Sequence, residues 1–165
     1  MNSVFRSMKR DDWISVAEIY GQGIESWNAT FQRDIPTWDE WNSGHIETCR
    51  IVATIDNEIT GWAALTPVSS RCVYTGVAEV SIYVSNKFRG QKIGTGLLEK
   101  LISESEKEGY WTLQASIFPE NQASLKMHEN LDFRKVGFRE KIGKMTGIWR
   151  DTILLERRSR KVGTQ

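Results

Sequence analysis

The chain has 165 residues, of which 39% are hydrophobic and 26% are charged, and its net charge is +1. This balance is typical of a folded protein, and the small net charge gives no overall field that would favour nucleic acid or a membrane surface. The length suits a single domain with a sizeable core. We therefore expect one domain over residues 1–165, and any anion site must be local.

Two cysteines and two histidines are too few, and too far apart, for a structural zinc site or a disulfide framework. We expect no metal and a reduced, cytoplasmic location. The first residues lack the apolar segment of a signal peptide, and no apolar run reaches membrane length. The basic tail, at about 158–165, is interpreted as a solvated end rather than a nucleic-acid-binding arm.

The first elements in chain order are a short strand over residues 3–7 and a helix that begins at Asp11 and Asp12. Acidic residues in a first turn are typical of a helix start. Two glycines weaken the end of this helix, which leads into residues 25–31. That segment either shapes the wall of a pocket or is an ordinary frayed end.

A second helix, a hairpin and a long strand are predicted next. Thr37 and Glu40 fit a capping box at the start of the helix. Residues 50–55 and 59–65 are apolar runs separated by a turn signal, which indicates a hairpin. Residues 73–84 form a long strand run that Gly76 interrupts, as a bulge or an irregular start would.

The second half of the chain alternates strands and helices. A helix from residue 94 to about 108 is followed by a strand over 112–118 and a helix that Asn121 can cap. Two strands, over 133–142 and 149–155, complete the chain. The whole pattern predicts a mixed α/β domain.

Residues 89–96 form a basic, glycine-bearing turn between a predicted strand and a predicted helix. A helix start has unpaired N–H groups and the positive end of the macrodipole, and glycines let an anion approach the backbone closely. Arg89 and Lys92 add charge. The spacing fits neither a dinucleotide fingerprint nor a nucleotide P-loop. The segment predicts a phosphate or pyrophosphate cradle, and the alternative is a solvated glycine-rich turn.

Short matches in order along nearly the whole chain resemble the phosphinothricin N-acetyltransferase branch of the GNAT superfamily. The matches are Asn28–Phe31, Pro36–Thr37 with Trp41, Gly61–Ala63, Arg71 with Tyr74, Ala78–Val84, Arg89–Leu98, Asn121–Ser124, Met127–Glu129, Val136–Phe138 and Gly147–Asp151. Asp132 departs from the pattern, since relatives commonly have glycine there, but aspartate tolerates left-handed geometry.

The resemblance implies a GNAT fold, with a mostly antiparallel sheet splayed into a V and acetyl-CoA in the gap. It implies direct transfer of acetyl to the primary amine of a small amino-acid-like acceptor such as phosphinothricin or methionine sulfoximine, a detoxifying role and a homodimer. It also implies donor-binding residues in the strand, the loop and two helix starts: Ile82, Tyr83, Val84, Arg89, Gly90, Gln91, Lys92, Ile93, Gly94, Thr95, Gly96, Asn121 and Ser124.

Glu79 and His128 are the predicted catalytic residues. Glu79 interrupts an apolar strand, so it faces either solvent or a polar pocket. An acceptor amine attacks only when neutral, and a carboxylate or an imidazole can take its proton. The resemblance pairs Glu79 with His128, which otherwise is a packing histidine. Ser124 or a water is the candidate that protonates the leaving thiolate.

The acceptor site is expected at Thr30 and Phe31, as a pocket wall, and at Arg71 and Tyr74, where an arginine suits an oxyanion. Asn121 either binds the pantetheine arm or caps its helix. Two other functions stay open: a GNAT enzyme that acts on a protein N-terminus or a polyamine, and an acetyl-CoA sensor without catalysis.

Overall fold

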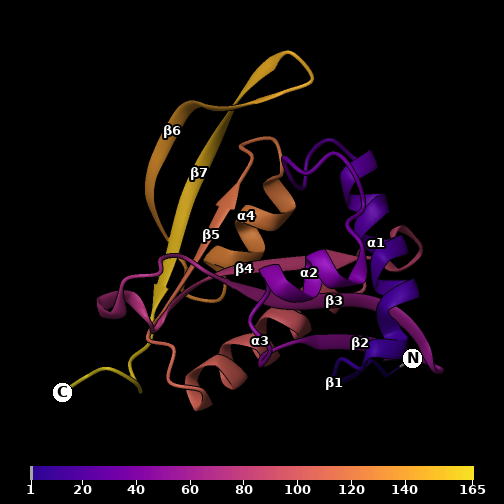
Figure 1. Ribbon diagram of the computed structural model, residues 1–165, viewed down its shortest axis with the longest axis horizontal. Helices are drawn as coiled ribbons and strands as arrows, with labels where there is room; N and C mark the ends of the chain where they lie inside the picture. Colours follow the sequence, from indigo (N-terminus) through magenta and orange to yellow (C-terminus); the bar gives the residue numbers. More distant parts are fainter. Residues whose placement is uncertain (1) are drawn as a thin grey trace.

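The structure is a computed structural model that describes residues 2–165. A seven-stranded sheet runs through the molecule in the order β1-β2-β3-β4-β5-β7-β6, and β4 and β5 form its parallel pair (Figure 1). The other neighbours are antiparallel. The strands are β1 (Val4–Ser7), β2 (Ile51–Ile55), β3 (Glu58–Pro67), β4 (Val77–Val84), β5 (Thr112–Ile117), β6 (Arg134–Met145) and β7 (Ile148–Arg158).

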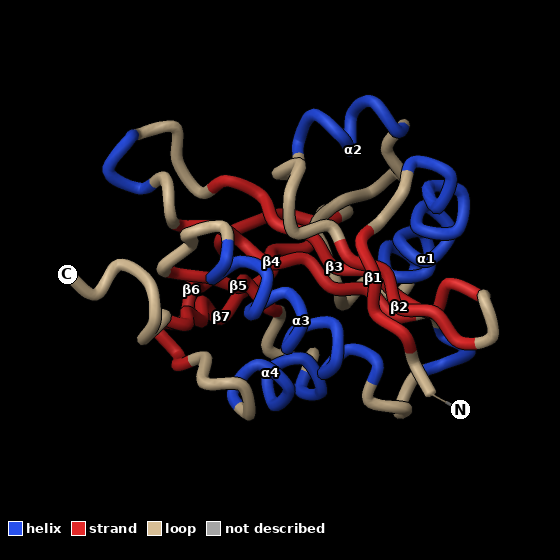
Figure 2. Tube along the Cα trace, turned by 90° about the horizontal axis from the view of Figure 1, so that it is seen from below, coloured by secondary structure: helices blue, strands red, loops and turns tan. Residues whose placement is uncertain are grey.

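Four α-helices cover the two faces of this sheet: α1 (Trp13–Glu25), α2 (Trp38–Gly44), α3 (Ile93–Lys107) and α4 (Gln122–Glu129). Helices α1 and α2 lie on one face, and α3 and α4 lie on the other (Figure 2). Alternate residues of β2 point to opposite faces, so Val52 packs with α1 while Ile51 packs with α3. This two-sided burial explains why β2 is a continuous apolar run.

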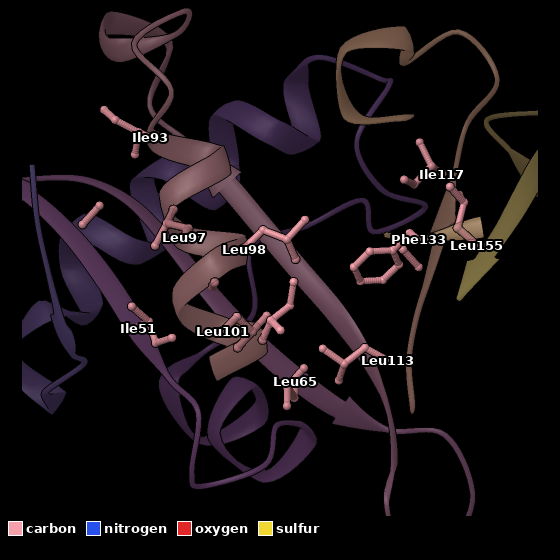
Figure 3. Close-up of a cluster of buried hydrophobic side chains, with 14 of the residues drawn as sticks. Ile51, Leu65, Ile93, Leu97, Leu98, Leu101, Leu113, Ile117, Phe133 and Leu155 are labelled. Carbon is pink, nitrogen blue, oxygen red and sulfur yellow. The ribbon is translucent and has the colours of Figure 1, made fainter. Parts of the chain in front are cut away.

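The larger core lies between α3 and the sheet (Figure 3). Leu97, Leu98 and Leu101 follow helical spacing on the buried face of α3, and all three are fully buried. Burial of such a side chain contributes about 1.5–3 kcal/mol of transfer free energy. The predicted amphipathic helix is confirmed, and it fixes the start of α3 against the sheet.

The sheet splays between β4 and β5. Their pairing joins Val77, Ala78 and Glu79 to residues 112–114 and ends there. Beyond Glu79, β4 stays paired with β3 on its other side and diverges from β5, as Figure 1 shows. The backbone edge of β4 that faces the gap therefore has no strand partner, which confirms the expected V-shaped sheet.

Several predicted boundaries are wrong by a few residues. β4 begins at Val77 rather than at residue 73, because a 3₁₀ turn occupies Cys72–Tyr74. Gly76 lies directly against the Trp111 ring, and a Cβ there would be 2.0 Å from a ring carbon. This glycine therefore allows Trp111 to pack at the strand start.

The last hairpin is longer than predicted. The sequence predicts strands over 133–142 and 149–155, but β6 and β7 extend to a two-residue turn at Thr146 and Gly147. Both residues have positive φ, as short hairpin turns require. Nearly all of β6 is exposed, and the hairpin projects beyond the body of the molecule (Figure 1).

A helix cap, a turn and the C-terminal tail can each be compared with the prediction from sequence. The predicted capping box of α2 is present, with the Thr37 N–H donating to Glu40 at 2.8 Å. Asp132 adopts the left-handed conformation expected of it. The basic tail is more firmly held than predicted, since Ser159 is buried and donates to Glu106 at 2.9 Å.

Candidate functional site

Two cavities flank the splayed end of β4. The first, here called the α3 cavity, has a volume of about 730 Å³ and lies at the start of α3. The second, the β4–β5 cavity, has a volume of about 330 Å³ and lies between the diverging strands, under the loop that follows α1. Six residues line both cavities: Asn28, Ala29, Ile82, Tyr83, Asn121 and Ser124. A long ligand in one cavity can therefore meet a small ligand in the other.

The start of α3 has the features of an anion site. Lys92 precedes the helix in the left-handed conformation, and its side chain makes no capping hydrogen bond to the helix. The first N–H groups of α3 therefore keep their hydrogen-bonding capacity for a ligand. Arg89, Gly90 and Lys92 line the α3 cavity, and a Cβ at Gly90 would meet nothing within 4 Å. A pyrophosphate fits this donor set.

The other glycines of the loop have different contacts. Gly94 lines the α3 cavity beside Met127, whose sulfur would lie 3.0 Å from an added Cβ. Gly96 lies against the ring of Phe5, and an added Cβ would come within 2.2 Å of that ring. Neither Gly96 nor Gln91 lines the α3 cavity. Gly96 is thus required for packing of the helix on β1.

The β4–β5 cavity contains the two predicted catalytic side chains. Glu79 is half-buried on β4 at the last residue paired with β5. His128 lies on α4, and 3% of its surface is exposed. Its Nδ1 lies 2.8 Å from the Ser124 carbonyl, which can only accept, so Nδ1 carries the proton. Nε2 is then an acceptor, and it has no partner within the described residues.

Burial sets the proton chemistry of this cavity. Desolvation lowers the pKa of His128, although the Ser124 carbonyl opposes the change, so the imidazole is neutral near neutral pH. Desolvation also raises the pKa of Tyr83, whose hydroxyl interacts with those of Tyr20 and Thr30. The cavity is therefore lined by a neutral imidazole at His128 and by Tyr83, whose hydroxyl keeps its proton near neutral pH.

The predicted acceptor residues divide into two groups. Thr30 and Phe31 line the β4–β5 cavity, so residues 25–31 do shape a pocket wall. Arg71 and Tyr74 lie on the exposed connection between β3 and β4, with the Arg71 guanidinium 5.7 Å from the Tyr74 ring, and they line neither cavity. Within this chain, the pair Thr30 and Phe31 is therefore not brought together with the pair Arg71 and Tyr74.

Asn121 caps its helix and also reaches another segment. Its Oδ1 accepts from the Ser124 N–H at 3.2 Å, and its Nδ2 donates to the Asn28 carbonyl at 3.2 Å. Ser124 in turn places its hydroxyl 3.4 Å from His128 Nδ1. Asn121 and Ser124 both line the junction of the two cavities.

Two residues of β7 at the site are not among the predicted site residues. Thr152 lines the β4–β5 cavity with a buried hydroxyl that has no partner within residues 2–165. Arg150 lies two residues earlier on the same face and contacts the loop after α1. Neither residue carries a signal in the sequence alone, because its place at the site depends on which segment of the chain β7 meets.

The part of the chain that the structure describes contains no group of three or more histidine, cysteine, aspartate or glutamate side chains that could hold a metal ion. Over the same residues, no helix is long and apolar enough to cross a membrane.

Comparison with known proteins identifies the class. Residues 10–133 match the acetyltransferase (GNAT) family. Together with the V-shaped sheet and the anion site at α3, this match shows that the chain belongs to the GNAT acetyltransferases. It is an acetyl-CoA-dependent N-acetyltransferase.

The relatives place the chain in the phosphinothricin acetyltransferase branch. It is 31% identical over 157 residues to YwnH of Bacillus subtilis (strain 168), a phosphinothricin acetyltransferase by provisional assignment, with 92% of this chain and 96% of YwnH covered. It is 28% identical over 158 residues to the phosphinothricin N-acetyltransferase of Alcaligenes faecalis, covering 92% of this chain and 80% of that protein. A phosphinothricin acetyltransferase from Sinorhizobium meliloti, solved with acetyl-CoA, superposes with a TM-score of 0.88 at 25% identity and covers 100% of this chain and 92% of that one.

Proposed function

We propose that the protein acetylates the primary amine of a small amino-acid-like acceptor with a tetrahedral, oxygen-rich end, such as phosphinothricin or methionine sulfoximine. The observation that carries this proposal is the meeting of the two cavities at β4. The larger suits a long nucleotide-bearing donor, and the smaller, at about 330 Å³, suits a compact acceptor. The named relatives support the same acceptor class.

Glu79 and His128 are proposed to remove the acceptor's proton. An α-amine is mostly protonated at neutral pH and becomes nucleophilic once it is neutral. Glu79 is the proposed base, directly or through a water, and the Nε2 lone pair of His128 is a second acceptor in the same cavity. Both groups line the smaller cavity, which meets the larger one where we propose that the thioester of acetyl-CoA lies.

Stabilisation of the developing oxyanion is assigned to the backbone of β4. Past Glu79 the β4 edge that faces the gap has no strand partner, so the alternate N–H groups that point there, in the region of Tyr83 and Val84, are available to the thioester carbonyl. Ser124, which lines both cavities, or a water is the proposed acid for the leaving thiolate. The backbone N–H groups of β4 are fixed in position before the reaction, which is how backbone donors contribute to catalysis.

A homodimer through the β6–β7 hairpin is part of the proposal. The hairpin exposes a set of large apolar side chains: Val136, Phe138, Ile142, Ile148 and Trp149. Large exposed apolar surface marks interaction sites, and β6 is an edge strand without a second neighbour. We also propose a cytoplasmic location and a role in detoxification, as expected from the sequence.

A panel of acceptors tests the function. Thiol release from acetyl-CoA would be followed with phosphinothricin, methionine sulfoximine, free amino acids, a polyamine and a peptide. Turnover with the two tetrahedral acceptors supports the proposal. Turnover confined to the peptide or the polyamine would move the acceptor to another class, and tight acetyl-CoA binding without turnover would indicate a sensor.

A further inference from the structure

One loop covers both cavities. It comprises residues 26–32, here called the strap, and joins the end of α1 to the segment that precedes α2. Asn28 and Ala29 line both cavities, and Thr30, Phe31 and Gln32 line the β4–β5 cavity. The strap contains no helix or strand, so its position depends on contacts with other elements.

Arg150 on β7 makes the polar contacts that fix the first half of the strap. Its Nη1 donates to the Trp27 carbonyl at 2.8 Å, and its Nη2 donates to Asn28 Oδ1 at 3.1 Å. Nη2 also lies 3.3 Å from a carboxylate oxygen of Glu120, and the guanidinium lies 4.0 Å from the centre of the Phe118 ring. Only 14% of the Arg150 side chain is exposed. One guanidinium thus joins the strap, β7 and the turn before α4, segments that Figure 1 shows beside one another.

The second half of the strap is fixed by packing. Phe31 packs edge-on against Phe118, with the ring centres 4.9 Å apart. The same ring lies against Gly143 of β6, where an added Cβ would come within 2.7 Å of it. The strap is therefore attached to the side of the V that carries β5, β6 and β7, while α1 attaches it to the other side.

We propose that Arg150 is a positioning residue that holds the strap across the opening of the V and so sets where the acceptor lies relative to the donor. This inference rests on the proposed function. Arg150 does not line either cavity, and its donors are already used by Trp27, Asn28 and Glu120, so it acts through the strap rather than on the acceptor. Charge-assisted hydrogen bonds with several partners give a planar guanidinium the rigidity that this task needs.

Substitution of Arg150 tests the inference through kinetics. Because a small misplacement of a bound acceptor weakens its productive binding, Arg150→Gln should raise the acceptor KM by about 10- to 100-fold, with a much smaller change in the acetyl-CoA KM. Arg150→Lys should recover part of this loss, since one ammonium can replace one of the contacts. Arg139→Gln is the matched control, because Arg139 lies on the same hairpin and makes no side-chain hydrogen bond or ion pair within residues 2–165.

Hydrogen exchange separates this inference from the proposed function, because it needs no turnover. In Arg150→Gln, amides of residues 26–32 should exchange at least about tenfold faster than in the native protein, and in Arg139→Gln they should be unchanged. Unchanged exchange in a folded Arg150→Gln protein would overturn the inference even if every acceptor is acetylated. Faster exchange would support it even if the acceptor class is wrong.

Gly143→Ala provides a second route to the strap. The new methyl group would displace Phe31 rather than remove a hydrogen bond, so faster exchange in residues 29–32 and a raised acceptor KM are expected here too. If Arg150→Gln does not fold, Arg150→Lys takes its place, because it keeps the charge and cannot make all the contacts of the guanidinium. Unchanged exchange in residues 26–32 and an unchanged acceptor KM in Arg150→Lys would then overturn the proposal.

Discussion

At the scale of single residues, the β4–β5 cavity is defined by groups that burial leaves without partners. His128 Nε2 and the Thr152 hydroxyl are both buried and line this cavity. A buried polar group without a partner costs about 1–3 kcal/mol, so such groups are retained where a ligand or water completes them. Glu79 lines the same cavity, at the point where β4 leaves β5.

Removal of the Glu79 carboxylate should slow the reaction without unfolding the protein. General-base catalysis typically supplies about 10²–10⁴ in rate, so Glu79→Gln should lower kcat by about a hundredfold or more. Steady-state kinetics with saturating acetyl-CoA measures this loss. Glu140→Gln, an exposed carboxylate on β6, is the control and should keep its native rate. A native rate in Glu79→Gln across pH would remove Glu79 from the role of base.

The pKa of His128 predicts a pH dependence of stability. Burial lowers this pKa below its ordinary value of 6.5, so the unfolded chain binds the proton first as the pH falls. The stabilisation is present above about pH 6.5 and is lost as the pH falls below it. Urea unfolding at about pH 7.5 and about pH 5.5 should therefore show a smaller loss of stability in His128→Gln than in the native protein.

His45 provides the comparison for that measurement. Burial lowers its pKa as well, so its contribution has the same sign and persists in His128→Gln. Equal losses in the native protein and in His128→Gln would show that His128 does not titrate differently on folding.

Residue types and order predicted part of this site. An acidic residue inside an apolar strand and a lone histidine on a helix direct attention to Glu79 and His128. Arg150 and Thr152 are different, because their importance depends on which segment of the chain β7 meets. That meeting joins residues more than 120 positions apart, as in the bond from Arg150 to Trp27. No local pattern contains this information.

At the scale of elements, α3 is fixed in the core by one face, while its first turn remains able to bind a ligand. Its buried leucines pack on the sheet, while its first turn has no side-chain cap. The predicted helix and the turn before it are present in the structure. They could be predicted because helical spacing and glycine positions are local properties of the sequence. The starts and ends of β4, β6 and β7 were predicted less accurately, since they depend on contacts such as that of Gly76 with Trp111.

Two substitutions in the same loop should have opposite phenotypes. Lys92→Glu places a negative charge beside the proposed pyrophosphate site, so it should raise the acetyl-CoA KM and leave the thermal stability nearly native. Gly96→Ala should instead lower the stability by about 1–3 kcal/mol, because its methyl group overlaps the Phe5 ring. Thermal unfolding and acetyl-CoA kinetics on both variants measure this difference. A native acetyl-CoA KM in Lys92→Glu would exclude that side chain from the anion site.

At the scale of the whole molecule, the splayed sheet places both substrates on one strand. The V shape was predicted from family resemblance, since strand propensity alone does not say where a parallel pair stops. The projecting β6–β7 hairpin is the other large-scale feature, and the exposure of its apolar side chains was not predictable, because the sequence does not show how far the hairpin extends beyond the core.

The proposed homodimer gives a prediction about mass in solution. The native protein should have twice the chain mass of 18.9 kDa by light scattering. Phe138→Glu places a charge in the exposed apolar set and should shift the protein toward the monomer. Ile14→Glu is the control, because Ile14 is an apolar residue on α1 that is even more exposed than Phe138 and lies outside the hairpin. A native protein that is monomeric at high concentration would contradict the dimer.

The acceptor preference tests the central claim most directly. The measurement is the ratio of kcat/KM for phosphinothricin to that for a short peptide with a free N-terminus, with the N-acetyl product identified by mass spectrometry. A compact polar cavity that meets the donor cavity at β4 predicts a ratio of about a hundred or more. A ratio below one would contradict the account, because it would require an open acceptor groove where the structure has a compact cavity lined by the strap.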